Sequence, residues 1–268
     1  MKVLILGCGP AGLMAAHAAA HYGANFVIYS KRRKSYMNGA QYLHAPIPDM
    51  SVSPPFTIRY QLSGEVEGYR QKVYGDAKVE VSPESLVGNH DAWDIRETYD
   101  NLWDKYNGAI MDEDLNPEVL VYLMRGWLPD LVISTIPATV LCHNSQHKFE
   151  AETIWSSDKA EPVLRDNTVL CNGEPSFSWY RASKIQGHEN TEWPFSSYPL
   201  EQGKLWRVTK PIRTTCNCFP DVHRMGRYGK WTKGVLSHQA WEESRNLMRA
   251  LLSGKAEPQN VQINTTGS

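Results

Sequence analysis

The chain has 268 residues, of which 41% are hydrophobic and 21% charged, and its formal net charge is −1. This composition is ordinary for a globular protein and supplies enough apolar side chains for one core or for two closely joined ones. A net charge near zero excludes a molecule-wide attraction to nucleic acid or anionic lipid, so any such attraction must come from a local patch.

The first 30 residues are typical of a β-α-β unit that binds a dinucleotide. The apolar run 3–6 predicts a strand, the alanine-rich segment 13–22 a helix, and residues 25–29 a second strand. Between the first strand and the helix, Gly7 permits a tight turn, Gly9 lets the backbone approach a pyrophosphate, and Gly12 lets the helix pack on the strand. The free N–H groups and the dipole at the helix start then suit the phosphates.

The middle of the chain alternates between loop, helix and buried strand. Residues 36–62 contain a proline cluster and predict a loop with short extended pieces. Residues 64–128 look mainly helical, with apolar side chains at helical spacing over 93–106 and a further helix beginning at Pro117. The continuous apolar run 130–137 predicts a buried strand of a parallel sheet.

Residues 148–213 have the pattern of an antiparallel sheet. Four segments rich in β-branched and aromatic residues are separated by Gly, Pro, Asn and Asp: 149–155, 168–171, 177–185 and 205–212. A last helix is expected over 237–252, and the polar residues 255–268 are expected to form a flexible tail.

Three separated segments together resemble the FAD-binding domain of the amine oxidase and UDP-galactopyranose mutase superfamily. They are the glycine turn, the run from Asp130 to Pro137, which ends in Thr-x-Pro, and the Gly-Arg-x-x-x-Trp segment from Gly226 to Trp231. The resemblance implies a Rossmann-type α/β fold and FAD as cofactor. The turn, the basic segment after the second strand and the resemblance together give a predicted cofactor-binding set of Gly7, Gly9, Pro10, Ala11, Gly12, Ser30, Lys31, Arg32, Gln41, Thr135, Pro137, Gly229, Lys230 and Trp231.

The end of the second strand departs from the family pattern. Family members place a glutamate there for the adenosine ribose, whereas this chain has Ser30, which lacks the charge-assisted strength of a carboxylate. The basic turn 31–34 that follows would suit a 2′-phosphate, so an NADP-type cofactor is a competing interpretation. A solvated loop would explain the same charges.

Shorter strings, 39–44 and 234–238, resemble small FAD-dependent proteins encoded by bacteriophages. That resemblance implies a substrate on modified thymidine in phage DNA, carrying an amine or amino-acid group that is oxidised or cleaved. We expect a cytoplasmic protein, in the host cytoplasm if phage-encoded, because no signal peptide is visible and the five cysteines lack a disulfide-scaffold spacing. The apolar stretches are too short for a membrane span.

Several residues are candidates for catalysis or for substrate binding. His44 and His238 could each act as a base, and Arg70 or Arg181 could clamp a carboxylate or a phosphate. A core or surface role would explain each of them equally well. The aromatic side chains of 93–106 and of Trp179-Tyr180 could line a partly dry cavity that favours a neutral amine.

Two other features of the sequence bear on metal binding and on DNA binding. Cys216 and Cys218 are separated by one residue rather than two, with no second cysteine pair nearby, so we expect no metal site. The stretch Lys204–Lys233 holds eight basic residues and the single acid Asp221, with aromatic residues between them. It could bind a cofactor, a nucleotide or a DNA backbone, or it could be a basic surface without a ligand.

The sequence therefore predicts a small α/β flavoprotein. We expect a discontinuous FAD-binding domain of residues 1–62, 129–147 and 214–254, and a substrate region of 63–128 and 148–213. The predicted activity is FAD-dependent oxidation of a small-molecule or nucleotide-linked amine. The alternatives are a non-redox flavoenzyme resembling the sugar mutase, an NADP-binding oxidoreductase, and a dinucleotide-binding module without turnover.

Overall fold

The computed structural model spans residues 1–268 and describes all of them except 32, 34–36, 38–40, 76–78, 200–202 and 255–268. The chain divides into two compact units, each assembled from separated segments. Unit 1 consists of Met1–Lys34, Tyr99–Phe149 and Arg213–Ser268, and unit 2 of Ser35–Thr98 and Glu150–Ile212. None of the helices within the described residues combines the length and the apolar character needed to cross a lipid bilayer.

Unit 1 is built on a five-stranded parallel sheet with the order β12-β6-β1-β2-β5. Its strands are β1 (Lys2–Leu6), β2 (Asn25–Ser30), β5 (Ile110–Asp112), β6 (Leu131–Ser134) and β12 (Val222–Arg224). Read from β5 to β12, their chain order is 3-2-1-4-5, which is that of the doubly wound dinucleotide-binding fold. In such sheets a ligand binds at the carboxyl ends of the strands where the order reverses, here between β1 and β6.

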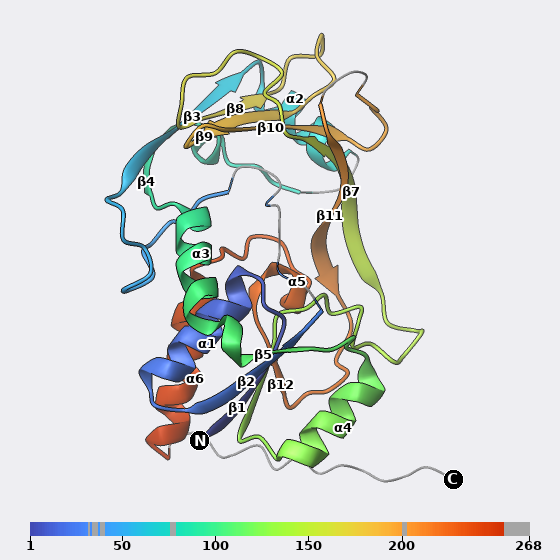
Figure 1. Ribbon diagram of the computed structural model, residues 1–268. Coiled ribbons are helices and arrows are strands. Elements are labelled where there is room, and N and C mark those ends of the chain that lie inside the picture. Colours follow the sequence, from blue (N-terminus) through green and yellow to red (C-terminus); the bar gives the residue numbers. More distant parts are fainter. Residues whose placement is uncertain (32, 34–36, 38–40, 76–78, 200–202, 255–268) are drawn as a thin grey trace. The chain divides into compact units, whose positions relative to one another are not determined.

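Helices cover both faces of this sheet (Figure 1). They are α1 (Pro10–His21), α3 (Ile95–Tyr106), α4 (Pro117–Trp127), α5 (Gly226–Lys230) and α6 (Gln239–Leu252), with a 3-10 turn η2 (Asn107–Ala109). On one face, α4 packs against Leu4, Leu6 and Val132. On the other, α1 and α6 lie together, where His17 stacks on Trp241 with ring centroids 4.8 Å apart.

Unit 2 is built on a seven-stranded sheet with the order β11-β7-β10-β9-β8-β3-β4. Neighbouring strands with a described register are antiparallel except β3 and β8, which are parallel. Helix α2 (Val66–Tyr74) and the 3-10 turn η1 (Pro83–Ser85) complete this unit. Its strands are β3 (Phe56–Ser63), β4 (Gly88–Ala92), β7 (Phe149–Ser157), β8 (Thr168–Asn172), β9 (Arg181–Ile185), β10 (His188–Pro194) and β11 (Leu205–Thr214).

Most predicted elements of unit 1 are confirmed, whereas the sheet of unit 2 is larger than expected. Strand β3 arises in the segment interpreted as loop, because the prolines that suggested a loop end at Pro55, directly before the strand. The region 64–128, expected to be mainly helical, also contains the short strands β4 and β5. Strand β10 was missed because it is buried on both faces and its buried residues include the polar Thr191 and Glu192, so apolar and polar positions do not alternate along it.

The division into units also differs from the predicted domain limits. Residues 41–62, expected in the dinucleotide-binding domain, belong to unit 2, and residues 99–128, expected in the substrate region, belong to unit 1. The difference arises from how the strands pair. Strand β3 pairs with β8 in the sheet of unit 2, whereas β5 pairs with β2, and α4 packs on the parallel sheet of unit 1. The other limits between the two units lie between Phe149 and Glu150 and between Ile212 and Arg213.

Candidate functional site

The glycine turn after β1 is closely packed at two of its three glycines. Gly7 has a φ of +102°, and a Cβ there would lie 2.6 Å from Thr135 Oγ1. A Cβ on Gly12 would lie 1.9 Å from the carbonyl oxygen of Gly7. A side chain at Gly7 would be strained by the positive φ and would displace the side chain of Thr135, whereas one at Gly12 would require the backbone of the turn to move.

Gly9 differs from the other two glycines. Its φ is −70° and its ψ is 178°, a conformation open to any residue, and among the described residues no heavy atom lies within 4 Å of the place for a Cβ. It is the N-cap of α1, and within the described part of the chain no side chain caps that helix. The first turn also lacks acidic residues. The absent side chain thus leaves open space at the positive end of a helix, which fits the close approach of a diphosphate.

The ends of β6 and α5 meet this turn. Thr135 donates hydrogen bonds to the carbonyl oxygen of Leu6 through its backbone N (2.9 Å) and through Oγ1 (3.0 Å). A Cβ on Gly229 of α5 would lie 2.6 Å from the carbonyl oxygen of Ser134. Pro137 follows in the same loop, where the N–H of Ala138 bonds the carbonyl oxygen of Tyr228 at 3.0 Å. Segments more than 200 residues apart therefore meet at the strand-order reversal.

The carboxyl end of β2 lies beside acidic residues. Ser30 hydrogen-bonds the thiol of Cys8. Burial raises the pKa of this thiol, and the hydrogen bond offsets part of that rise. In the parallel register Ser30 pairs with Asp112, which the sequence analysis had not singled out. Lys31 forms an exposed ion pair with Asp114 at 2.7 Å. Arg32, also predicted to bind the cofactor, lies outside the described residues.

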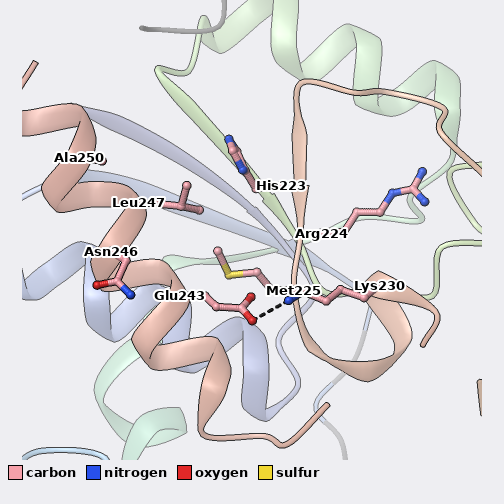
Figure 2. A pocket seen from close by; sticks show the side chains of 8 residues that line it. All are labelled: His223, Arg224, Met225, Lys230, Glu243, Asn246, Leu247 and Ala250. Carbon is pink, nitrogen blue, oxygen red and sulfur yellow. Dashed lines mark hydrogen bonds and ion pairs between the residues drawn. The ribbon is translucent and has the colours of Figure 1, made fainter. Parts of the chain in front are cut away.

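Lys230 and Trp231 make contacts within unit 1. Trp231 is buried with a φ of +50°, and its ring meets Phe149 edge-on at 5.5 Å. The Lys230 ammonium lies 2.5 Å from Glu243 of α6, in a pocket of about 430 Å³ shown in Figure 2. The pocket is lined by His223, Arg224, Met225, Lys230, Glu243, Asn246, Leu247 and Ala250, so it does not coincide with the glycine turn.

The catalytic candidates and Gln41 are distributed over both units. His238 is half-buried and directly precedes α6 in unit 1. His44 is exposed in unit 2, with its ring 4.7 Å from Tyr42. Arg70 forms an ion pair with Glu67, one turn away on α2, at 2.6 Å. Gln41 also belongs to unit 2, where its backbone oxygen is 3.5 Å from Arg96 Nη1.

The predicted aromatic wall mixes core and partly exposed side chains, because Trp93 and Trp103 are partly exposed whereas its other aromatic residues are buried. On α3, Tyr99 is buried and its hydroxyl donates to the carbonyl oxygen of Cys8 at 2.9 Å, while Tyr106 contacts His17. Trp179 and Tyr180 are buried in unit 2. Within unit 1, the hydroxyl of Tyr99 on α3 fixes the backbone of the glycine turn.

Arg181 is engaged in a buried ionic cluster of unit 2. Its guanidinium lies 2.7 Å from Glu192, and the Lys210 ammonium lies 2.8 Å from the same carboxylate and from the Tyr180 hydroxyl. Burial alone would raise the pKa of Glu192, but the two cations outweigh it and lower that pKa to about 2. The single carboxylate is shared by two cations, so this buried cluster keeps a net charge of +1, and the Arg181 guanidinium is already paired with Glu192.

Comparisons with known proteins find similar folds among solved structures, at low sequence identity. No protein-family model matches the sequence, and no curated protein matches it. Among solved structures, reduced UDP-galactopyranose mutase is similar with a TM-score of 0.58 at 11% identity, covering 96% of each chain. The flavin-dependent halogenase BrvH from Brevundimonas sp. BAL3 has a TM-score of 0.53 at 12% identity, over 97% of this chain and 73% of that chain.

A third similar structure is the tetracycline destructase Tet(51), with a TM-score of 0.54 at 10% identity, over 94% of this chain and 82% of that chain. At such identities the likeness shows the fold alone. It confirms the predicted fold class, a Rossmann-type α/β unit of the kind found in flavoproteins, combined with a second region of strands and helices.

Proposed function

We propose that the chain is a flavoenzyme that binds FAD in unit 1, with the diphosphate at the N-terminus of α1. The observation that carries this proposal is the contrast among the glycines of the turn. Gly7 and Gly12 are required by packing, whereas Gly9 has open space and an ordinary backbone conformation. A bound diphosphate explains why Gly9 carries no side chain. The fold shared with a reduced mutase and a flavin-dependent halogenase is consistent with this assignment.

The end of β2 favours FAD over NADP. The adenosine ribose of a dinucleotide in this fold lies near the end of the second strand. Asp112, in register with Ser30, could accept hydrogen bonds from the ribose hydroxyls, as the family's glutamate does. Asp114 neutralises Lys31, and the adjacent carboxylates would repel a 2′-phosphate.

Replacing Asp112 by asparagine is therefore expected to weaken FAD binding by about tenfold, because a charge-assisted hydrogen bond contributes about 1.5–3 kcal/mol. The matched control is Asp114→Asn, which breaks only an exposed ion pair and should change the affinity by about twofold or less. Isothermal titration of the apoprotein with FAD measures both. Equal affinities for the two variants would remove Asp112 from the cofactor site.

When bound, FAD supplies the electron transfer, and the chain positions cofactor and substrate. We propose that the reaction is oxidation of an amine or amino-acid group, such as one carried by a modified thymidine of phage DNA. The support is the resemblance of the motifs to the amine oxidase superfamily and to small phage flavoproteins. Such a reaction requires a neutral amine, which a dry site favours because burial disfavours the ammonium form. His44, His238 and Arg70 remain candidates for substrate contacts.

A DNA-borne substrate would require a basic contact surface. In the predicted stretch Lys204–Lys233, the exposed residues Lys204 and Arg207 of unit 2 are the candidates. Lys204 lies over the Trp206 ring at 5.3 Å, and Arg207 lies over the Phe195 ring at 4.9 Å. We expect DNA binding to weaken steeply as the salt concentration rises. The double variant Lys204→Ala/Arg207→Ala should lower the slope of log K against log salt concentration by about two, because each residue would neutralise about one phosphate. Fluorescence anisotropy with a labelled duplex at several salt concentrations measures this slope. An unchanged slope would exclude the two residues from DNA binding.

The spectrum of the purified protein separates the proposed function from its alternatives. A yellow protein that releases FAD on denaturation supports a flavoprotein, and bleaching by an amine without oxygen supports oxidation. Activity only after chemical reduction would support a mutase-like, non-redox reaction, in which reduced flavin acts as nucleophile. A colourless protein that binds NADP would support the nicotinamide alternative, and a stable colour without turnover would support a binding module.

A further inference from the structure

Four potential metal ligands meet in unit 1, in two loops that are distant in the sequence. Cys142 and His147 lie in the loop after β6, and Cys216 and Cys218 lie in the loop before β12. One ligand atom from each residue lies within 4.8 Å of the other three. Strands β6 and β12 are neighbours in the parallel sheet, which is why the two loops come together.

The described distances agree with tetrahedral coordination. Cys142 Sγ lies 3.4 Å from His147 Nδ1, Cys218 Sγ lies 3.5 Å from the same nitrogen, and the two sulfur atoms are 4.0 Å apart. A tetrahedral site with Zn–S bonds of about 2.3 Å and Zn–N bonds of about 2.0 Å places neighbouring sulfurs about 3.8 Å apart and sulfur and nitrogen about 3.5 Å apart. An ion can therefore be bound with only small side-chain movements.

We propose that Cys142, His147, Cys216 and Cys218 form a binding site for a divalent metal ion of the zinc type. Three thiolates and one imidazole nitrogen are a ligand set that zinc prefers over the harder cations. Because the protein supplies all four ligands, no coordination position is left for water or substrate. The site is therefore structural, and it clamps the loop after β6 to the loop before β12.

The surroundings of the cluster favour thiolate ligands. Arg224 donates from Nη2 to Cys216 Sγ at 3.3 Å and to the carbonyl oxygen of Cys218 at 2.8 Å, and from Nη1 to the carbonyl oxygen of Cys216 at 3.0 Å. A cation in this position stabilises a negatively charged sulfur and fixes the short loop between the two cysteines. The loops are also joined by a hydrogen bond from the Lys148 N–H to Thr215 Oγ1 at 2.9 Å.

A disulfide is the competing chemistry for these cysteines. The 4.0 Å between Cys142 Sγ and Cys218 Sγ is about twice the length of a disulfide bond, which is about 2.05 Å, and no disulfide joins any of the five cysteines. A disulfide would also leave the third cysteine and the histidine without a role, whereas a metal ion uses all four.

The direct test is the metal content of the full-length, reduced protein after expression with added zinc. Mass spectrometry of the digested sample should find about one zinc per chain, and replacement by cobalt should give the visible bands of a tetrahedral thiolate site. His147→Ala and Cys142→Ser should each lower zinc affinity by about a hundredfold or more, and Arg224→Ala by about tenfold. The matched control is Cys171→Ser, a buried cysteine of unit 2 that should leave the zinc content unchanged.

Several results would overturn the proposal. They are a wild-type protein that takes up neither zinc nor cobalt, full zinc content in both ligand variants, or a native mass lower by two hydrogens with a Cys142–Cys218 disulfide. If the ligand variants fail to fold, the wild-type zinc content and its loss to a chelator decide alone. Loss of zinc should then lower the melting temperature, as expected for a metal that stabilises the folded chain.

Discussion

Replacing Gly9 by valine is expected to weaken FAD binding by about a hundredfold while unit 1 stays folded. The backbone at Gly9 is extended, and the space where a side chain would go is open, so valine fits the protein itself. The same side chain would occupy the place proposed for the diphosphate. Loss of one or two charge-assisted hydrogen bonds at about 1.5–3 kcal/mol each lowers the affinity by about a hundredfold. Titration of the apoprotein with FAD, together with circular dichroism, measures both effects.

Two other glycines provide matched controls for this variant. Gly126 in α4 also has open space and an ordinary φ, so Gly126→Ala should bind FAD normally. Gly12→Ala should instead destabilise the whole unit, because its Cβ would meet the Gly7 carbonyl oxygen at 1.9 Å. Normal FAD affinity in the Gly9→Val variant would disprove the proposed location of the diphosphate.

Replacing Glu192 by alanine is expected to destabilise unit 2 by about 3–5 kcal/mol, because it leaves two cations partly buried without their partner. Glu192 is 2% exposed and pairs with Arg181 at 2.7 Å and with Lys210 at 2.8 Å. The control is Glu189→Ala on the same strand, which breaks a partly exposed pair with Lys184 and a hydrogen bond from the Ala160 N–H at 3.3 Å, and which should cost about 1 kcal/mol or less. Urea unfolding followed by tryptophan fluorescence gives both values. Similar values for the two variants would contradict a stabilising role for the buried cluster.

The same carboxylate predicts the pH dependence of stability. The pKa of Glu192 is lowered to about 2 in the folded protein, compared with about 4.3 in an unfolded chain. Its contribution is therefore fully present above about pH 4.3 and is lost as the pH falls toward 2. The difference in unfolding free energy between wild type and Glu192→Ala should shrink between pH 5 and pH 3. A difference that stays constant over that interval would contradict the lowered pKa.

Elements whose signals are local could be predicted from the order of the amino acids. The strand, turn and helix at residues 2–21 follow from an apolar run, three glycines and an alanine-rich segment, and each signal lies within a few residues of the structure it specifies. The helix α4 likewise follows from Pro117 at its first turn and a regular apolar face. Because these features depend on backbone conformation and short-range periodicity, they could be predicted without knowing what packs against them.

The neighbours that come from distant parts of the chain could not be predicted, because they depend on how the strands are arranged in each sheet. The pairing of Ser30 with Asp112 depends on a three-residue strand too short to leave a periodic signal. The metal-ligand cluster was missed because Cys142 and His147 are separated from Cys216 by about 70 residues, and only the pairing of β6 with β12 brings them together. Long-range contacts of this kind are set by sheet order and by packing of whole elements. A single sequence records its residues in chain order, and it does not record which strands lie side by side.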